Sequence, residues 1–158
     1  MGQVILVLGA FTLLIFMTMT VNQAISNRMD DNYQAVAVIS ATSLAQSMIN
    51  QVCQKAFDDS ALIYPADDET QLTPVGTLGP DVGEVYATYD DIDDFDDYVR
   101  KDTSANGMFT TSVSVVYLNP TNLNSTSAVR TFYKKVTATV TAQELKNIPI
   151  SLSRIVSY

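Results

Sequence analysis

The segment that decides the fold is residues 4–21, VILVLGAFTLLIFMTMTV, inside a run of residues 1–27 without a charged side chain. As a helix with a rise of about 1.5 Å per residue it spans about 27 Å, close to the hydrocarbon thickness of a bilayer. Its threonines can donate hydrogen bonds to the backbone of the preceding turn. We therefore expect a helix that lies in lipid or in an equally apolar protein environment. The side chains expected to face that environment are Val4, Ile5, Leu6, Leu8, Phe11, Leu13, Leu14, Phe16, Met17 and Val21.

The helix is predicted to continue well beyond this apolar segment. Between Gly9 and Pro65 the sequence holds neither glycine nor proline, and the predicted helix covers residues 4–57. Residues 1–27 are apolar on every side, whereas residues 28–57 continue the helix in amphipathic form. The predicted apolar stripe of this second half comprises Tyr33, Val36, Ser40, Leu44, Met48, Val52 and Ala56, with Ala41, Ala45, Ile49 and Cys53 beside it. We accordingly expect Cys53 to be buried in the core.

The second half of the chain separates into an acidic connector and a sheet. Residues 58–107 are rich in proline, glycine and acid, and their part 58–102 carries fourteen acids against Arg100 and Lys101. From residue 108 the apolar period changes to two, which predicts a small antiparallel sheet of three strands over 108–158. An antiparallel sheet with one apolar face must cover that face, and the amphipathic part of the helix is the available partner. The predicted fold class is α+β, with one long helix packed on the sheet.

Composition excludes several classes of function. The chain has 158 residues, no histidine, one cysteine and a net charge of −8. These counts remove disulfides, Cys/His zinc sites and histidine-dependent catalytic dyads, so we expect no enzymatic activity and no catalytic residue. The acidic balance also argues against a nucleic-acid partner.

The densest polar feature is the run Asp90, Asp91, Asp93, Asp94, Asp96 and Asp97. Carboxylates at this density could bind Ca²⁺, which prefers six to eight oxygen ligands, and no other cofactor is expected. The alternative is a capped helical turn, with Asp90 or Asp91 at its N-cap and with Ile92, Phe95 and Tyr98 anchored in the core. A second candidate is Asn124, which begins an N-x-[ST] glycosylation acceptor in a predicted loop.

The order of apolar helix, variable loop and C-terminal antiparallel sheet resembles type IV pilins and the pseudopilins of type II secretion. In detail the chain resembles minor-pilin-like proteins of the mannose-sensitive haemagglutinin pilus group. That finer likeness rests on 89–98 (YDDIDDFDDY), 134–141 (KKVTATVT) and 150–158 (ISLSRIVSY). The chain departs from the family in lacking a basic leader before Met1 and the glutamate usual at mature position five. These departures suggest a divergent subunit or one at the filament tip, and we favour a repeated subunit.

The resemblance implies a subunit of a surface filament. Such a subunit is held in the cytoplasmic membrane before assembly, and assembly machinery inserts it among copies of itself through the apolar helix. Lys134, Lys135 and Arg154 could then meet the acidic loop of an adjacent subunit, the alternative being solvated charge within one chain. Adhesion, motility and scaffolding remain open as roles. The rival interpretations are a single-span membrane-anchored binding module with the acidic loop as its ligand site, and a secretion-system pseudopilin.

Overall fold

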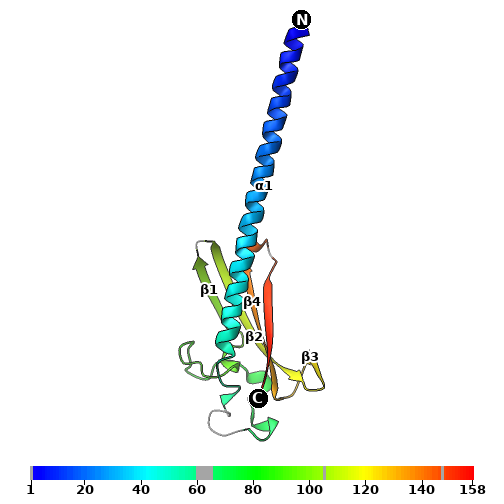
Figure 1. The fold of residues 1–158 in the computed structure, drawn as a ribbon. Helices are drawn as coiled ribbons and strands as arrows, with labels where there is room; N and C mark the ends of the chain where they lie inside the picture. The colour runs from blue at the N-terminus through cyan, green and yellow to red at the C-terminus, as the bar shows by residue number, and fades with distance from the viewer. Residues whose placement is uncertain (1, 60–65, 105, 147) are drawn as a thin grey trace. The chain divides into compact units, whose positions relative to one another are not determined.

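The computed structural model describes residues 2–59, 66–104, 106–146 and 148–158, which group into two compact units, Met1–Val36 and Ala37–Tyr158. We call these the N-terminal unit and the head. Helix α1, Gly2–Val52, supplies all described residues of the N-terminal unit and the first element of the head (Figure 1). The long helix packed on an antiparallel sheet confirms the predicted α+β fold class.

Helix α1 ends at Val52, five residues before its predicted end at residue 57. The chain after it forms backbone hydrogen bonds with the distant segment 90–92 in place of further helical bonds. The N–H groups of Gln54 and Lys55 bond three residues back, at 3.4 and 3.0 Å, which tightens the last turn. Ala56 then donates its N–H to Asp90 O at 3.1 Å and accepts from the N–H of Ile92 at 3.0 Å. A local apolar stripe carries no information about this contact.

The part of α1 within the head buries a face built around small side chains. Its buried residues are Ala37, Ala41, Ala45, Met48, Ile49 and Val52. The predicted stripe was therefore correct from residue 41 onward and wrong at its start, because Tyr33 and Val36 are 67% and 43% exposed. Alanines four residues apart allow the helix backbone to lie close to the sheet.

The described residues form five strands and four short 3₁₀ helices. The strands are β1 (Val99–Ser104), β2 (Gly107–Asn119), β3 (Asn122–Thr126), β4 (Tyr133–Ala142) and β5 (Ile150–Ser157). The 3₁₀ helices are η1 (Glu69–Gln71), η2 (Val75–Thr77), η3 (Asp93–Phe95) and η4 (Gln143–Leu145). The strand order is β1-β2-β4-β5 with every pairing antiparallel, and β3 pairs with the far end of β2.

The three predicted strands correspond to β2, β4 and β5, whereas β1 and β3 were missed. Strand β1 reads VRKDTS and β3 reads NLNST, and neither shows an apolar alternation. Both are stabilised by backbone pairing to β2 and not by a buried face of their own. Pairing of this kind depends on the partner strand and leaves no periodicity in the sequence.

The main core lies between α1 and the sheet. On β2 the inward positions Phe109, Val113 and Val115 are buried, and on β4 the same holds for Val136, Ala138 and Val140. The register places Val113 opposite Ala138 and Val115 opposite Val136. Cys53 packs at the margin of this core and is half-buried, so the expectation of full burial was wrong.

Candidate assembly surface and polar clusters of the head

The candidate functional surface of the N-terminal unit is the apolar circumference of α1. Its most apolar window of 18 residues has a mean hydropathy of 2.5 and no buried share, so the helix is long and apolar enough to cross a membrane. The ten side chains predicted to face an apolar environment are all exposed, from 49% for Val21 to 76% for Leu6. Exposed apolar surface of this extent marks an interaction site with protein or lipid.

The threonines of this segment have satisfied hydroxyl groups. Thr12 Oγ1 donates to Gly9 O, and Thr18 Oγ1 donates to Leu14 O, both at 2.8 Å. Thr20 Oγ1 lies 2.9 Å from Met17 O and 3.1 Å from Phe16 O. Because these polar groups bond to their own helix, the surface can enter an apolar environment without unpaired donors.

The aspartate run forms a turn held by its own carboxylates, as the alternative interpretation predicted, but the N-cap position of η3 is Ile92 and not Asp90 or Asp91. Asp94 Oδ2 accepts the N–H groups of Asp90 and Asp91 at 2.9 and 3.2 Å, and Asp91 Oδ1 accepts the N–H of Asp94 at 3.1 Å. These reciprocal bonds have the logic of a capping box around η3. Ile92 and Phe95 anchor the turn as predicted, at 0% and 1% exposure.

Burial of Asp91 and the charge of the neighbouring Asp93 carboxyl raise the pKa of Asp91 above its usual range. Several of the six carboxylates accept backbone N–H groups of the turn or of β2, and calcium binding by the run stays a prediction. Asp96 Oδ1, for example, accepts the N–H of Val115 at 2.7 Å and so ties the turn to β2.

Sequence reasoning missed Glu84, which joins two members of the run. Oxygens of Glu84, Asp90 and Asp94 all lie within 4.8 Å of one another, and we call these three residues the acidic cluster. Burial and the Asp94 carboxyl raise the pKa of Glu84. Glu84 stands six residues before Asp90 in a loop, so no spacing rule would have placed it there.

The structure corrects the prediction for Lys134. Its side chain is fully buried, and Nζ lies 3.0 Å from Asp58 Oδ2 and 2.6 Å from Asp93 Oδ1. It cannot serve as a contact between subunits, because Asp58 and Asp93 enclose it within one chain. The alternation of β4 could have predicted this burial, since Lys134 is two residues from the buried Val136 and points to the same face of the sheet.

The charged group around Lys134, which we call the buried triad, consists of Lys134, Asp58 and Asp93. Lys134 Nζ also donates to Phe57 O at 2.6 Å. The Tyr117 hydroxyl donates to Thr73 O at 2.9 Å and lies 3.4 Å from Asp58 Oδ2. Burial first, and the Asp58 charge second, raise the pKa of Tyr117, so that its hydroxyl stays a donor.

The other two predicted basic contacts lie on opposite faces of the sheet. Arg154 is the register partner of the inward-facing Val136, so its side chain leaves from the core face at the sheet edge, whereas Lys135 leaves from the other face. Arg154 is close enough to Cys53 for its charge to offset part of the rise in the Cys53 thiol pKa that burial causes. The three residues predicted to meet the acidic loop of an adjacent subunit therefore do not share one surface, and for Lys135 and Arg154 that contact stays a prediction.

Asn124 is exposed, as its predicted loop required, although it lies on β3. The backbone N–H of Asn124 donates to Asn122 Oδ1 at 3.2 Å. The acceptor position is therefore open to modification chemistry, and glycosylation there stays a prediction.

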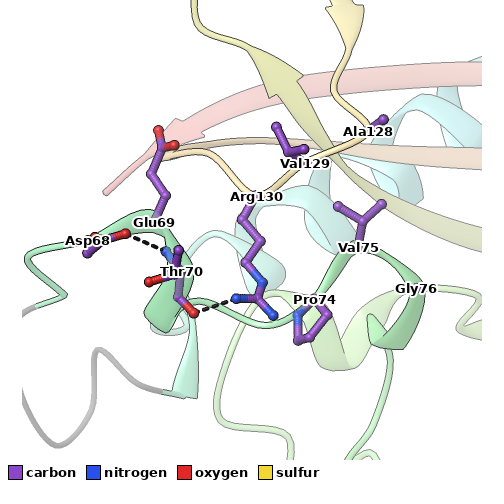
Figure 2. Close-up of a pocket in the computed structure, with 9 residues that line it drawn as sticks. All are labelled: Asp68, Glu69, Thr70, Pro74, Val75, Gly76, Ala128, Val129 and Arg130. Carbon is purple, nitrogen blue, oxygen red and sulfur yellow. Dashed lines mark hydrogen bonds between the residues drawn. The ribbon is translucent and has the colours of Figure 1, made fainter.

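A pocket of about 530 Å³ opens between the loop carrying η1 and the segment before β4 (Figure 2). Its lining residues are Asp68, Glu69, Thr70, Pro74, Val75, Gly76, Ala128, Val129 and Arg130. Arg130 donates to Thr70 O across the pocket, and the Thr70 N–H donates to Asp68 Oδ1 at 2.8 Å. The pocket thus combines Arg130 and the acidic residues Asp68 and Glu69 with apolar side chains, and the Arg130 bond joins its two loops.

Comparison of the chain with protein-family models, with curated proteins and with solved structures finds no match.

Proposed function

We propose that this chain is a structural subunit of a type IV pilus-like surface filament that polymerises through the apolar part of α1. Before assembly the same segment anchors the subunit in the cytoplasmic membrane, and assembly machinery transfers it into the filament. The observation that carries this proposal is the mean hydropathy of 2.5 in a helical window without buried residues. The pilin-like order of elements supports it through resemblance.

The energetic argument follows from the size of the exposed apolar surface. Burial contributes about 0.8 kcal/mol per CH₂, so ten large side chains amount to tens of kcal/mol when they leave water. Surface ion pairs contribute about 0–1 kcal/mol each and cannot compete. A helix that is apolar on every side can be removed from water in two environments, a lipid bilayer or a bundle of helices from copies of the same chain. The bundle of copies is a polymer.

The experiment is electron microscopy of filaments sheared from producing cells, with mass spectrometry of the same fraction. In the test variant Leu13→Lys a charge enters a position that is 72% exposed in the single chain. We expect loss of filaments, because the charge would be buried among neighbouring helices. Ser43→Lys, at an exposed position of α1 within the head, is the matched control and should assemble normally.

A filament fraction in which this chain dominates would support the proposal. Normal filaments from the Leu13→Lys variant would refute assembly through α1. Absence from the sheared fraction, together with recovery from detergent-soluble membranes, would favour the membrane-anchored module instead. Recovery with a secretion complex would favour the pseudopilin.

A further inference from the structure

The buried triad brings an amine and two carboxylates into contact where water is excluded. Lys134, Asp58 and Asp93 are 0%, 1% and 3% exposed. Their contacts join three separate parts of the head, because Asp58 follows α1, Asp93 begins η3 and Lys134 lies on β4. Aromatic rings close the site, with Nζ 4.6 Å from the centroid of Phe57 and 5.2 Å from that of Tyr117.

We propose that Lys134 and Asp58 condense to an intramolecular isopeptide bond, with Asp93 as the residue that relays the protons. The Lys134 Nζ atom becomes bonded to Asp58 Cγ, and one molecule of water leaves. The bond would close a loop between residues 76 positions apart and fix the segment after α1 to the centre of the sheet. The inference does not depend on the proposed filament.

The step balances without any oxidant, reductant or further reactant. The lysine ammonium gives two protons in succession to Asp93, whose Oδ1 lies 2.6 Å from Nζ. In the proposed step Asp93 passes both protons to Asp58 Oδ1, which becomes the oxygen of the water. The Nζ lone pair forms the Nζ–Cγ bond, and the Cγ–Oδ1 bonding pair leaves with the water. An ammonium and a carboxylate become a neutral amide, while Asp93 returns to its starting form.

The geometry assigns Asp58 as the carboxyl that the amine attacks, because hydrogen-bond donors surround Oδ2, the oxygen that stays in the amide. Asp58 Oδ2 accepts the Thr73 N–H at 2.9 Å, and the Tyr117 hydroxyl lies 3.4 Å away. Donors placed around a carboxyl oxygen stabilise the negative charge that it gains when an amine attacks the carbon. Asp93, in contrast, places Oδ1 2.6 Å from Nζ, which is the position required of the residue that takes up its protons.

Two physical effects favour condensation in this site. Fixed contact between amine and carboxyl replaces a bimolecular encounter, an effect equivalent to a high local concentration of the reactants. Exclusion of water removes the solvent that would hydrolyse the amide. The reaction also removes two buried charges, whose desolvation is costly even in a paired state.

The test is the intact mass of the full chain, purified in detergent micelles. We expect the mass to fall below that of the sequence by one water, and a branched tryptic peptide to join residues 56–100 to residues 131–135. Fragment ions should place the branch between Lys134 and Asp58. Asp93→Asn should restore the full mass, whereas Asp102→Asn, in the half-buried pair with Arg100, should leave the water loss unchanged.

Full mass in the wild-type chain after prolonged incubation would overturn the proposal, and that measurement needs no variant to fold. Water loss in a product that hydroxylamine converts to a hydroxamate would also overturn it, because this reaction identifies a succinimide. A branch on Asp93 would overturn the assignment of Asp58 as acceptor. Circular dichroism of the Asp93→Asn protein shows whether a restored full mass belongs to a folded chain; a folded variant at full mass supports the relay, and a folded variant that still loses water refutes it.

Discussion

Replacing Thr111 by valine is expected to stabilise the head. Thr111 is 1% exposed on β2, and among the residues that the structure describes its Oγ1 has no hydrogen-bond partner. Its register partner on β4 is the buried Val140. Valine keeps the branched shape that strands favour and replaces the unpaired hydroxyl by a methyl group of similar size.

The magnitude follows from the cost of the unpaired hydroxyl. Burial of such a group without a partner costs about 1–3 kcal/mol, so Thr111→Val should raise the free energy of unfolding by about 1–2 kcal/mol. For a unit of this size that corresponds to a rise in Tm of about 3–6 °C. Urea and thermal unfolding of the full chain in micelles, followed by circular dichroism, would measure both values.

The matched control is Thr131→Val, because Thr131 is equally buried but its hydroxyl is paired. Its Oγ1 donates to Leu118 O at 2.8 Å, and the Tyr133 N–H lies 3.3 Å from the same oxygen. Loss of these bonds should lower the free energy of unfolding by about 1–2 kcal/mol. Equal destabilisation of the head by both variants would refute the argument, since it would show that the Thr111 hydroxyl is paired in solution.

Four further predictions concern the charged groups and one glycine of the head. Lys134→Met should lower the free energy of unfolding by about 3–5 kcal/mol, because the variant leaves the two buried carboxyls of Asp58 and Asp93 without a lysine partner, and urea unfolding measures it. Gly107→Ala should lower Tm for two reasons: the added Cβ would lie 2.5 Å from the Glu144 carboxyl, and φ is +128°, where residues other than glycine are strained. Adding Glu144→Ala removes the clash but not the backbone strain, so it should restore only part of the lost Tm. Burial and nearby carboxyls raise the pKa of Asp59 to about 7, against about 3.9 in an unfolded chain. Between about pH 4 and pH 7 the folded state binds more protons than the unfolded chain, so the stability that protonated Asp59 contributes is complete below about pH 4 and lost as pH rises through about 7. Tm should therefore fall between about pH 4 and pH 7. Calcium binding at the acidic cluster predicts a Tm that drops with chelator, and an unchanged unfolding curve would remove calcium from consideration.

The sequence predicted those parts of the fold whose signal is periodic. The buried alternation Phe109, Thr111, Val113, Val115 and Tyr117 was read correctly, because a strand covered by a helix must alternate. The end of α1 and strand β1 could not be read, since both depend on backbone bonds to residues far along the chain.

The candidate sites divide in the same way. The exposed apolar surface of the N-terminal unit follows from composition alone, so it could be predicted. The prediction that Lys134 contacts another subunit was wrong because it rested on the charge of the side chain and not on its inward-facing position in the alternation of β4. Its partner Asp58 stands 76 residues away and Glu84 lies in an irregular loop, so neither contact leaves a local pattern.

Helix α1 shows how one helix serves two different requirements. Within the head its buried residues form one face, in which three alanines spaced four apart are followed by Met48, Ile49 and Val52, and a single sheet is enough to cover one face. Over residues 4–21 large apolar side chains point in every direction, and a single sheet covers one side of a helix only. That segment needs an environment that surrounds it, whether lipid or other helices. Substitutions in 4–21 should therefore change where the chain resides or assembles, whereas substitutions in the buried triad should change the stability of the head.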